Sequence, residues 1–174
     1  MRRVQLILQD ELFMEYINRN VDTCQQHSFC NHDLAHMIDV ARIAYILVLE
    51  HNDMEYFIQV ANLAGRMAAK EIIYTAGLLH DIGKWEEYDT GADHATYGSY
   101  LVRELLPRFE FDDNETAIIA RAVFEHRNIS EEMSFLGERL HRADNLSRVC
   151  AQCAEKKGCI KFNNKEMSPT LLVY

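Results

Sequence analysis

The sequence predicts an all-α fold, and two observations favour it. Glycine and proline, which interrupt helices, are absent from the first 64 residues, and only two prolines, Pro107 and Pro169, occur in the chain. Apolar residues recur at spacings of three and four in at least five segments, as on the core-facing side of a helix. A chain of 174 residues suits one helical domain, which we place at residues 1–149, followed by a short cysteine-containing C-terminal tail at residues 150–174.

Each predicted helix is placed by apolar residues that share one of its faces. In the first segment, Val40, Ile43 and Leu47 follow His36 by four, seven and eleven positions, which is helical spacing. The same kind of stripe predicts four later helices, over residues 72–80, 94–105, 119–126 and 136–144. Helices striped in this way bury the stripe against one another, so the sequence favours a helical bundle.

Turn-forming and capping residues separate the later helices. The stretch ELLPRFEFDDNE ends one helix near its proline, and we expect Asp113 or Asn114 to cap the next one. In the stretch RNISEE, Ser130 is the expected cap of a further helix. The helical periodicity is lost after Ser147, and for this reason the tail is separated from the domain.

Composition and charge limit the classes of partner. The net charge is −9 and no basic run exceeds two residues, as at Lys156 and Lys157, so we expect a small molecule and no nucleic acid polymer as the partner. No apolar run approaches the roughly 20 residues that cross a bilayer, and polar residues interrupt the N-terminal stretch MRRVQLILQDELF. We therefore expect a cytoplasmic protein without a membrane segment. The sequence leaves its oligomeric state open.

Histidines and aspartates occupy positions on the predicted apolar faces, where polar side chains are unusual. Five of them lie in separate helical segments: His36, His80, His94, His126 and Asp144. One such histidine is usually hydrogen-bonded to the backbone, but five in separate segments favour a shared cause. The carboxylates of Asp81 and Asp144 have no basic partner on their own stripes, and burying them unpaired would cost several kcal/mol. A bound cation would remove that cost.

The donor types indicate which cation fits. Imidazole and carboxylate together suit first-row divalent metals, namely iron, manganese, cobalt, nickel or zinc. The stretch LLHDIGK puts His80 and Asp81 side by side at a helix end, where Gly83 would allow the chain to turn away. The sequence therefore predicts a metal site whose ligands come from five helices.

The order of His36, His80, Asp81 and Asp144, with HDIGK at the doublet and RADNLSR around the last aspartate, resembles the HD-domain superfamily. The resemblance covers about residues 31–148. It implies an all-helical HD-domain bundle in which these four residues hold one metal ion.

Two further histidines, His94 and His126, match the additional histidines of the binuclear subset of that superfamily. The resemblance therefore implies a second ion held by these two histidines, with the Asp81 carboxylate bridging both ions. Two divalent transition-metal ions are the cofactors that we expect, and a metal-dependent phosphohydrolase of the HDIG type is the implied class of enzyme.

Two cationic residues beside the predicted ligands are candidates for binding a phosphate. Lys84 lies three residues after Asp81, and Arg148 lies four residues, about one helical turn, after Asp144. A guanidinium binds phosphate oxygens in bidentate fashion, which favours Arg148 as the clamp. We expect Lys84 to contribute to both catalysis and substrate binding. The alternatives are a solvated lysine at a helix end and a surface ion pair of Arg148.

The remaining histidines are not predicted ligands. In the stretch NHDLAH, we expect Asp33 to be a favourable charge in the first turn of a helix and His32 to flank the helix start. His32 is nevertheless expected near the site, because it lies four residues from His36. Three others lack an apolar stripe and are expected at surface or structural positions: His27, His51 and His141.

The cysteines of the tail form a CxxC pair followed by a third cysteine: Cys150, Cys153 and Cys159. A closed zinc site needs four ligands, so a fourth would have to come from another part of the chain. The candidates for that fourth ligand are Cys24, Cys30 and His27. An iron–sulfur cluster and simple reduced thiols are the alternatives.

The function implied by the resemblance is hydrolysis of a small phosphate ester, such as a nucleotide or a related metabolite. A hydroxide bridging the two ions would be the nucleophile, since metal binding lowers the pKa of water to about 7. Asp81 would fix the pair of ions, and Lys84 and Arg148 would neutralise charge on the phosphate oxygens. Two alternatives stay open: an HD-type di-iron oxygenase acting on inositol or a phosphonate, which shares the six ligands, and a non-catalytic ligand-binding module.

Overall fold

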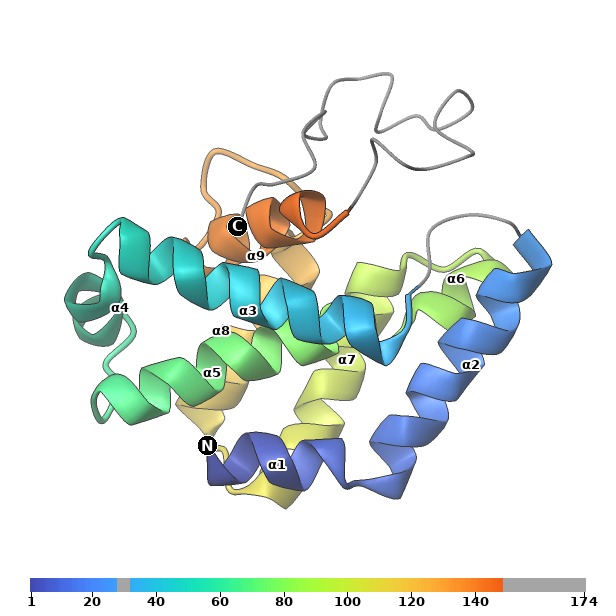
Figure 1. Cartoon of the computed structure of the whole chain (residues 1–174), viewed down its shortest axis with the longest axis horizontal. Helices are drawn as coiled ribbons and strands as arrows, with labels where there is room; N and C mark the ends of the chain where they lie inside the picture. The colour runs from blue at the N-terminus through green and yellow to red at the C-terminus, as the bar shows by residue number, and fades with distance from the viewer. Residues whose placement is uncertain (28–31, 149–174) are drawn as a thin grey trace.

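Every described element of the computed structural model is a helix (Figure 1). The structure describes residues 1–27 and 32–148, with only the backbone described for residues 24–27. In chain order the elements are α1 (Arg2–Leu8), α2 (Glu11–His27), α3 (Leu34–Glu50), α4 (Met54–Val60), α5 (Arg66–Leu79), α6 (Lys84–Thr90), α7 (His94–Leu105), the 3-10 helix η1 (Leu106–Phe109), α8 (Asp113–Glu125) and α9 (Phe135–Leu146). The predicted all-α fold is confirmed, and each of the five striped segments lies in one of these helices or at its end.

The bundle is organised around the packing of α3 along α5. Helix α7 packs along α8, and α9 packs on both α3 and α8 (Figure 1). One apolar core runs between these helices and includes Met37, Val40 and Ile72, whose exposed fractions are all 0%. Gly77 of α5 lets α3 approach closely, because a Cβ there would overlap the backbone of Ala41. The close crossing holds the C-terminal end of α5 against the first half of α3.

Polar contacts attach the two N-terminal helices to the bundle. Arg3 of α1 donates to Glu71 of α5 at 2.7 Å and to Glu115 of α8 at 2.5 Å. These three side chains are between 8% and 13% exposed, so the pairing is largely shielded from water. Helix α2 lies against α6, where the fully buried Asn20 contacts the backbone on either side of the turn between α5 and α6.

Helix α8 begins one residue earlier than the predicted caps allow. Asp112 is its N-cap, and the prediction of Asp113 or Asn114 is wrong. The Asp112 carboxylate accepts from the Glu115 N–H at 2.8 Å, and the Glu115 carboxylate accepts from the Asp112 N–H at 3.2 Å. This reciprocal capping box satisfies two N–H groups at once, which a cap placed later in the acidic run would not do.

Helix α9 begins later than predicted. Ser134 is its N-cap and accepts from the Gly137 N–H at 3.1 Å, so the prediction of Ser130 is wrong. Glu125, at the end of α8, explains the difference, because its carboxylate accepts from both the N–H and the hydroxyl of Ser134. A contact between two helices therefore fixes this start, and local sequence does not.

Residues 149–174 lie outside the described part of the chain, and so do the predicted roles of Cys150, Cys153 and Cys159. The same holds for Cys30 and for the side chains of Cys24 and His27. The boundary between domain and tail therefore stays a prediction. Among the described residues, no helix is both long enough and apolar enough to span a membrane.

Candidate metal centre

The six predicted ligands converge at one end of the bundle. They come from the first turn of α3, the C-terminal end of α5, the start of α7 and the C-terminal ends of α8 and α9: His36, His80, Asp81, His94, His126 and Asp144. Their side chains are between 0% and 8% exposed. Ligands on the apolar stripes of five separate helices therefore meet at one place, as the sequence predicts.

Asp81 lies at the middle of this cluster, and its two carboxylate oxygens face different pairs of imidazoles. Oδ2 lies 3.1 Å from Nε2 of His80 and 3.7 Å from Nε2 of His36. Oδ1 lies 3.0 Å from Nε2 of His94 and 3.5 Å from Nε2 of His126. One carboxylate thus belongs to two sets of donor atoms.

The two sets differ in size. The first contains His36, His80, Asp81 and Asp144, and the second contains Asp81, His94 and His126. Within each set all the ligand atoms lie within 4.8 Å of one another. The set of four and the set of three share Asp81, so six residues form two adjacent clusters that could each hold a metal ion.

Two of the imidazoles are oriented by hydrogen bonds from Nδ1 to backbone carbonyl groups. Nδ1 of His80 donates to the carbonyl of Gly77 at 2.8 Å, and Nδ1 of His126 donates to the carbonyl of Val123 at 2.6 Å. A carbonyl only accepts, so each Nδ1 carries a proton, and Nε2 is the ring nitrogen that faces the central carboxylate. Nε2 of His80 and of His94 are buried and have no hydrogen-bond partner among the described residues. Lone pairs that face a carboxylate need a proton or a cation between them, so these residues fit a metal ion.

The electrostatics of the centre support the same reading. Burial opposes a charged imidazolium at His80, but the carboxylates of Asp81 and Asp144 outweigh it and raise the pKa of His80 to about 10. Burial also opposes the charged form of Asp81, yet the surrounding imidazoles hold the pKa of Asp81 well below its usual range. His80 is therefore protonated when no metal is bound, and a metal ion that binds its Nε2 has to displace that proton.

His32 lies closer to the centre than its predicted place beside the helix start. Its Nδ1 is 2.6 Å from Oδ2 of Asp81, and the residue is only 7% exposed. Burial outweighs the nearby carboxylate and lowers the pKa of His32 to about 4, so the ring is neutral and donates a hydrogen bond to Asp81. Asp33 is the N-cap of α3, outside the predicted first turn, and accepts from the His36 N–H at 2.9 Å. The four-residue spacing to His36 was the usable signal.

Asn20 of α2 is a residue near the centre that the sequence analysis missed. Its side-chain amide donates to the carbonyl of Asp81 at 2.9 Å, and its carbonyl oxygen accepts from the Trp85 N–H at 2.8 Å. The side chain thus joins the two ends of the turn that carries Asp81. Asn20 shares a helix face with Phe13 and Ile17, and a polar residue on that apolar stripe was the available signal.

Gly83 is required at this turn for a different reason than predicted. Its φ of −97° and ψ of 12° are accessible to other residues, so turning the chain does not demand glycine. A Cβ at this position would lie 2.9 Å from the backbone nitrogen of Gly98 and 3.0 Å from the carbonyl oxygen of His94. The absence of a side chain therefore allows the turn to pack against α7 and brings His94 next to Asp81.

Arg148 lies beside the first donor set. Its guanidinium donates to Oδ1 of Asp144 at 2.7 Å, and the same nitrogen lies 3.4 Å from Nε2 of His36 and 4.0 Å from Oδ2 of Asp81. The prediction that Asp144 has no basic partner on its stripe is therefore wrong. The alternative of a surface ion pair does not apply either, because the Arg148 side chain is only 10% exposed.

Lys84 is buried next to the second donor set, at 6% exposure. Its ammonium donates to the Glu87 carboxylate at 2.9 Å and lies 3.4 Å from Nδ1 of His94. This is the nitrogen of the ring that faces away from Asp81. The alternative of a solvated lysine is thus wrong, while the predicted contacts of Lys84 with a substrate stay a prediction.

The two other described histidines lie outside the centre. His51 is the exposed C-cap of α3. Nδ1 of His141 donates to the backbone carbonyl of His126 at 2.9 Å, which supports the end of α8. Their predicted surface and structural positions agree with these contacts.

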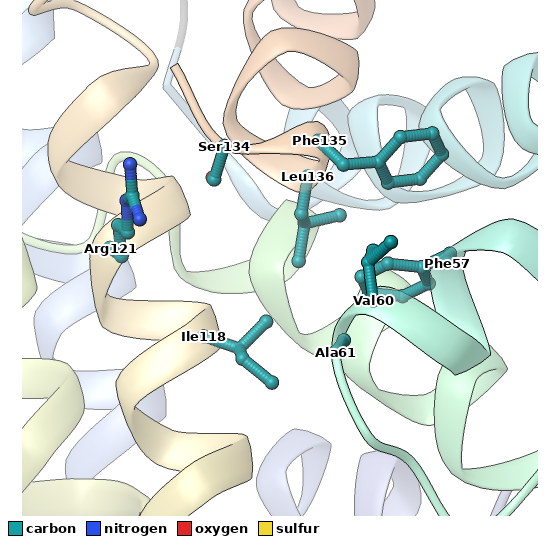
Figure 2. A pocket seen from close by; sticks show the side chains of 8 residues that line it. All are labelled: Phe57, Val60, Ala61, Ile118, Arg121, Ser134, Phe135 and Leu136. Atoms are coloured by element: carbon teal, nitrogen blue, oxygen red, sulfur yellow. The ribbon is translucent and has the colours of Figure 1, made fainter. Parts of the chain in front are cut away.

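A separate cavity of about 160 Å³ lies between α4, α8 and the start of α9 (Figure 2). Its lining is mostly apolar: Phe57, Val60, Ala61, Ile118, Phe135 and Leu136, together with Arg121 and Ser134. Arg121 is already bound to the Glu125 carboxylate at 2.7 Å and to the Glu132 carbonyl at 3.0 Å. The cavity contains none of the predicted ligands.

The fold and the centre define an all-helical protein with buried, adjacent clusters of imidazoles and carboxylates. Comparison with known families agrees, since the model of the HD domain matches residues 33–149. The chain belongs to the HD-domain family.

Individual relatives have the following similarities. An uncharacterized protein from Clostridium beijerinckii is 33% identical over 159 residues, which are 91% of this chain and 92% of that protein. Ribonuclease Y from Lactobacillus helveticus is 30% identical over 113 residues, but the match covers 62% of this chain and only 19% of the ribonuclease. A crystal structure of a predicted HD superfamily hydrolase from an uncultured Thermotogales bacterium superposes with a TM-score of 0.49 at 26% identity, covering 83% of this chain and 72% of that one.

Proposed function

We propose that the protein is a metal-dependent phosphohydrolase that cleaves a small phosphate ester, such as a nucleotide or a related metabolite. The observation that carries this proposal is the Asp81 carboxylate, whose two oxygens face two separate sets of imidazoles. Two divalent transition-metal ions, held by these residues, would polarise a phosphate and supply a water-derived nucleophile at neutral pH. Their ligands would be the four donors of the first set and the three donors of the second.

The residues around Asp81 would keep its carboxylate in place for this task. His32 donates to one carboxylate oxygen at 2.6 Å, and Asn20 donates to the backbone carbonyl of Asp81 at 2.9 Å. A carboxylate that must serve two sets of donors has to keep one orientation, and these contacts would restrain the carboxylate and the turn that carries it. We therefore assign positioning roles to His32 and Asn20.

The substrate phosphate would be bound by Arg148. Its guanidinium lies beside the first donor set, 2.7 Å from the Asp144 carboxylate and 3.4 Å from Nε2 of His36, and a guanidinium binds phosphate oxygens in bidentate fashion. Lys84 is the second candidate for substrate binding and catalysis, because its ammonium lies near the second donor set. Neutralising charge on phosphate oxygens is the contribution that we propose for both residues.

The names of two relatives support chemistry at phosphate groups. One is ribonuclease Y, and the other is a bifunctional uridylyltransferase and uridylyl-removing enzyme from Erythrobacter litoralis, 36% identical over 61 residues. The matched segments cover only 19% and 6% of those proteins, so their substrates do not transfer to this chain. A net charge of −9 disfavours a long polyanion, and we propose a small ester in the cytoplasm without nucleic acid or membrane partners.

The test is a screen under strict anaerobiosis with manganese, cobalt or nickel, using nucleotides, other phosphate esters and a short RNA. We expect release of phosphate or a nucleoside by the wild type and none by Asp81→Asn. Cleavage of RNA alone would overturn the small-ester assignment.

A redox function has to be separated from hydrolysis, because histidine and carboxylate ligands also suit iron that reacts with oxygen. Absence of ester cleavage, combined with oxygen consumption by the iron form given inositol or a hydroxyphosphonate, would identify a di-iron oxygenase. Absence of both reactions, with intact ligand binding, would identify a non-catalytic module.

A further inference from the structure

His94 differs from His80 and His126 in the group that its Nδ1 contacts. Nδ1 of His80 and of His126 contact neutral backbone carbonyls, those of Gly77 and Val123. Nδ1 of His94 contacts the carboxylate of Glu87 instead. A charged acceptor therefore stands behind one histidine of the second donor set.

Glu87 comes from α6, the short helix that directly follows the Asp81 turn, and lies seven residues before His94. Its side chain is 30% exposed, whereas His94 is 1% exposed, so the contact reaches from the surface into the buried centre. Lys84, the first residue of the same helix, donates to the same carboxylate oxygen at 2.9 Å. The Glu87 carboxylate is therefore shared between an ammonium and an imidazole.

These two neighbours act on the ring in opposite directions. A carboxylate that accepts the Nδ1 proton fixes the tautomer, leaves Nε2 free and makes it a stronger donor to a metal ion. The Lys84 ammonium, 3.4 Å from Nδ1, repels a cation at the ring and draws charge from Glu87. The balance between them matters more at this set, which has three protein donors, than at the other, which has four.

We propose that Glu87 is a positioning residue for the second donor set and that Glu87 and Lys84 together set how tightly an ion is held by His94 and His126. Neither side chain has to touch the ion for this effect. The role rests on the proposed function in one respect, because the centre must hold two ions. Beyond the proposed function, Glu87 and Lys84 would control how fully the second donor set is occupied by an ion.

The test is a calorimetric titration of the full chain with Mn²⁺ alone, together with elemental analysis of the bound metal. In the wild type we expect two binding steps. Glu87→Ala should weaken one step by about 10–100-fold and leave the other unchanged, and Glu87→Gln, which keeps an acceptor but no charge, should have a smaller effect on the same step. Lys84→Met should tighten that step. Glu86→Gln, on the same helix, is the matched control and should change neither step.

Several results would overturn the inference. It fails if the Glu87 variants unfold at a lower temperature without metal but bind both ions with unchanged affinity, because Glu87 would then be structural only. It also fails if the wild type binds a single ion, or if Lys84→Met weakens the step that Glu87→Ala weakens. If two ions bind and respond to Glu87 while no phosphate ester is cleaved, the inference stands and the proposed function fails.

Discussion

The ion-pair cluster around Arg3 and the centre around Asp81, both in the described part of the chain, are built differently. In the first, the Arg3 guanidinium donates to the carboxylates of Glu71 at 2.7 Å and Glu115 at 2.5 Å, and it also lies 4.1 Å from the centre of the Phe111 ring. In the second, the Asp81 carboxylate is surrounded by imidazoles, and two buried Nε2 atoms have no hydrogen-bond partner within residues 1–27 and 32–148. The first cluster contains the cation that its carboxylates need, whereas the second contains too few cations for the acceptors that face one another in it.

This difference distinguishes a structural ion-pair cluster from a metal-binding site. A carboxylate pair that is satisfied by an internal guanidinium needs nothing from solution, and it joins α1 to α5 and α8. A set of acceptors that face one another is stable only with a proton or a metal ion between them. Stability should therefore depend on added metal through the second cluster and not through the first.

The largest expected effect is that of Asp81→Ala. A carboxylate shared by both donor sets affects both ions, so bound metal and activity should fall to background together, and the melting temperature should no longer rise on adding Mn²⁺. Elemental analysis and thermal melts measure this. Asp89→Ala, an exposed aspartate on α6, is the control and should behave like the wild type. Full metal content in Asp81→Ala would refute the assignment.

A change at the other cluster should have the opposite profile. Arg3→Ala leaves two buried carboxylates without their cation, and it should lower the free energy of unfolding by about 3 kcal/mol, with or without Mn²⁺. Denaturant unfolding measures this. Arg2→Ala, whose partner Glu110 lies at the surface, should change stability little. A loss of metal from folded Arg3→Ala would remove the distinction between the clusters.

A smaller effect should appear in the pH dependence of metal binding. The pKa of His80 is raised to about 10, so the ring is protonated below that pH, and the metal must displace the proton. Apparent affinity for Mn²⁺ should therefore fall as pH decreases, by about tenfold per unit for each proton displaced. Calorimetry in two buffers of different ionisation enthalpy would detect the proton release. An affinity that is constant between pH 6.5 and pH 8.5, with no proton released, would contradict this account.

The smallest effect is expected from removing the tail. All six predicted ligands precede it, so a protein ending after Cys150 should keep its metal content and its activity. Elemental analysis and the visible spectrum check this. A truncated protein that folds without metal, or a full chain whose activity needs a cysteine-bound iron–sulfur cluster, would show that the tail belongs to the chemistry.

The parts of the centre that sequence predicts are those set by helical spacing. His36 and Asp144 could be assigned because each lies on the apolar stripe of its own helix, and the stripes of a bundle meet in one core. The fold class follows from the same pattern. No knowledge of how the helices cross was needed for either prediction.

The missed residues depend on how the helices cross. Asn20 reaches Asp81 across 61 residues of sequence. Glu87 was missed for a related reason, because its contact with His94 requires α6 and the start of α7 to fold back on one another. The cap at Ser134 likewise depends on Glu125 of another helix. Local spacing does not show which residues such contacts join.

The most direct test of the central claim is the ratio of Mn²⁺ to protein in the wild type and in His94→Ala. His94 belongs only to the second donor set, whereas the first keeps all four of its donors in this variant. We expect about two ions per wild-type chain and about one per His94→Ala chain, with the remaining ion bound at unchanged affinity. A wild type that binds no ion, or a variant that binds as many ions as the wild type, would contradict a shared carboxylate between two metal sites.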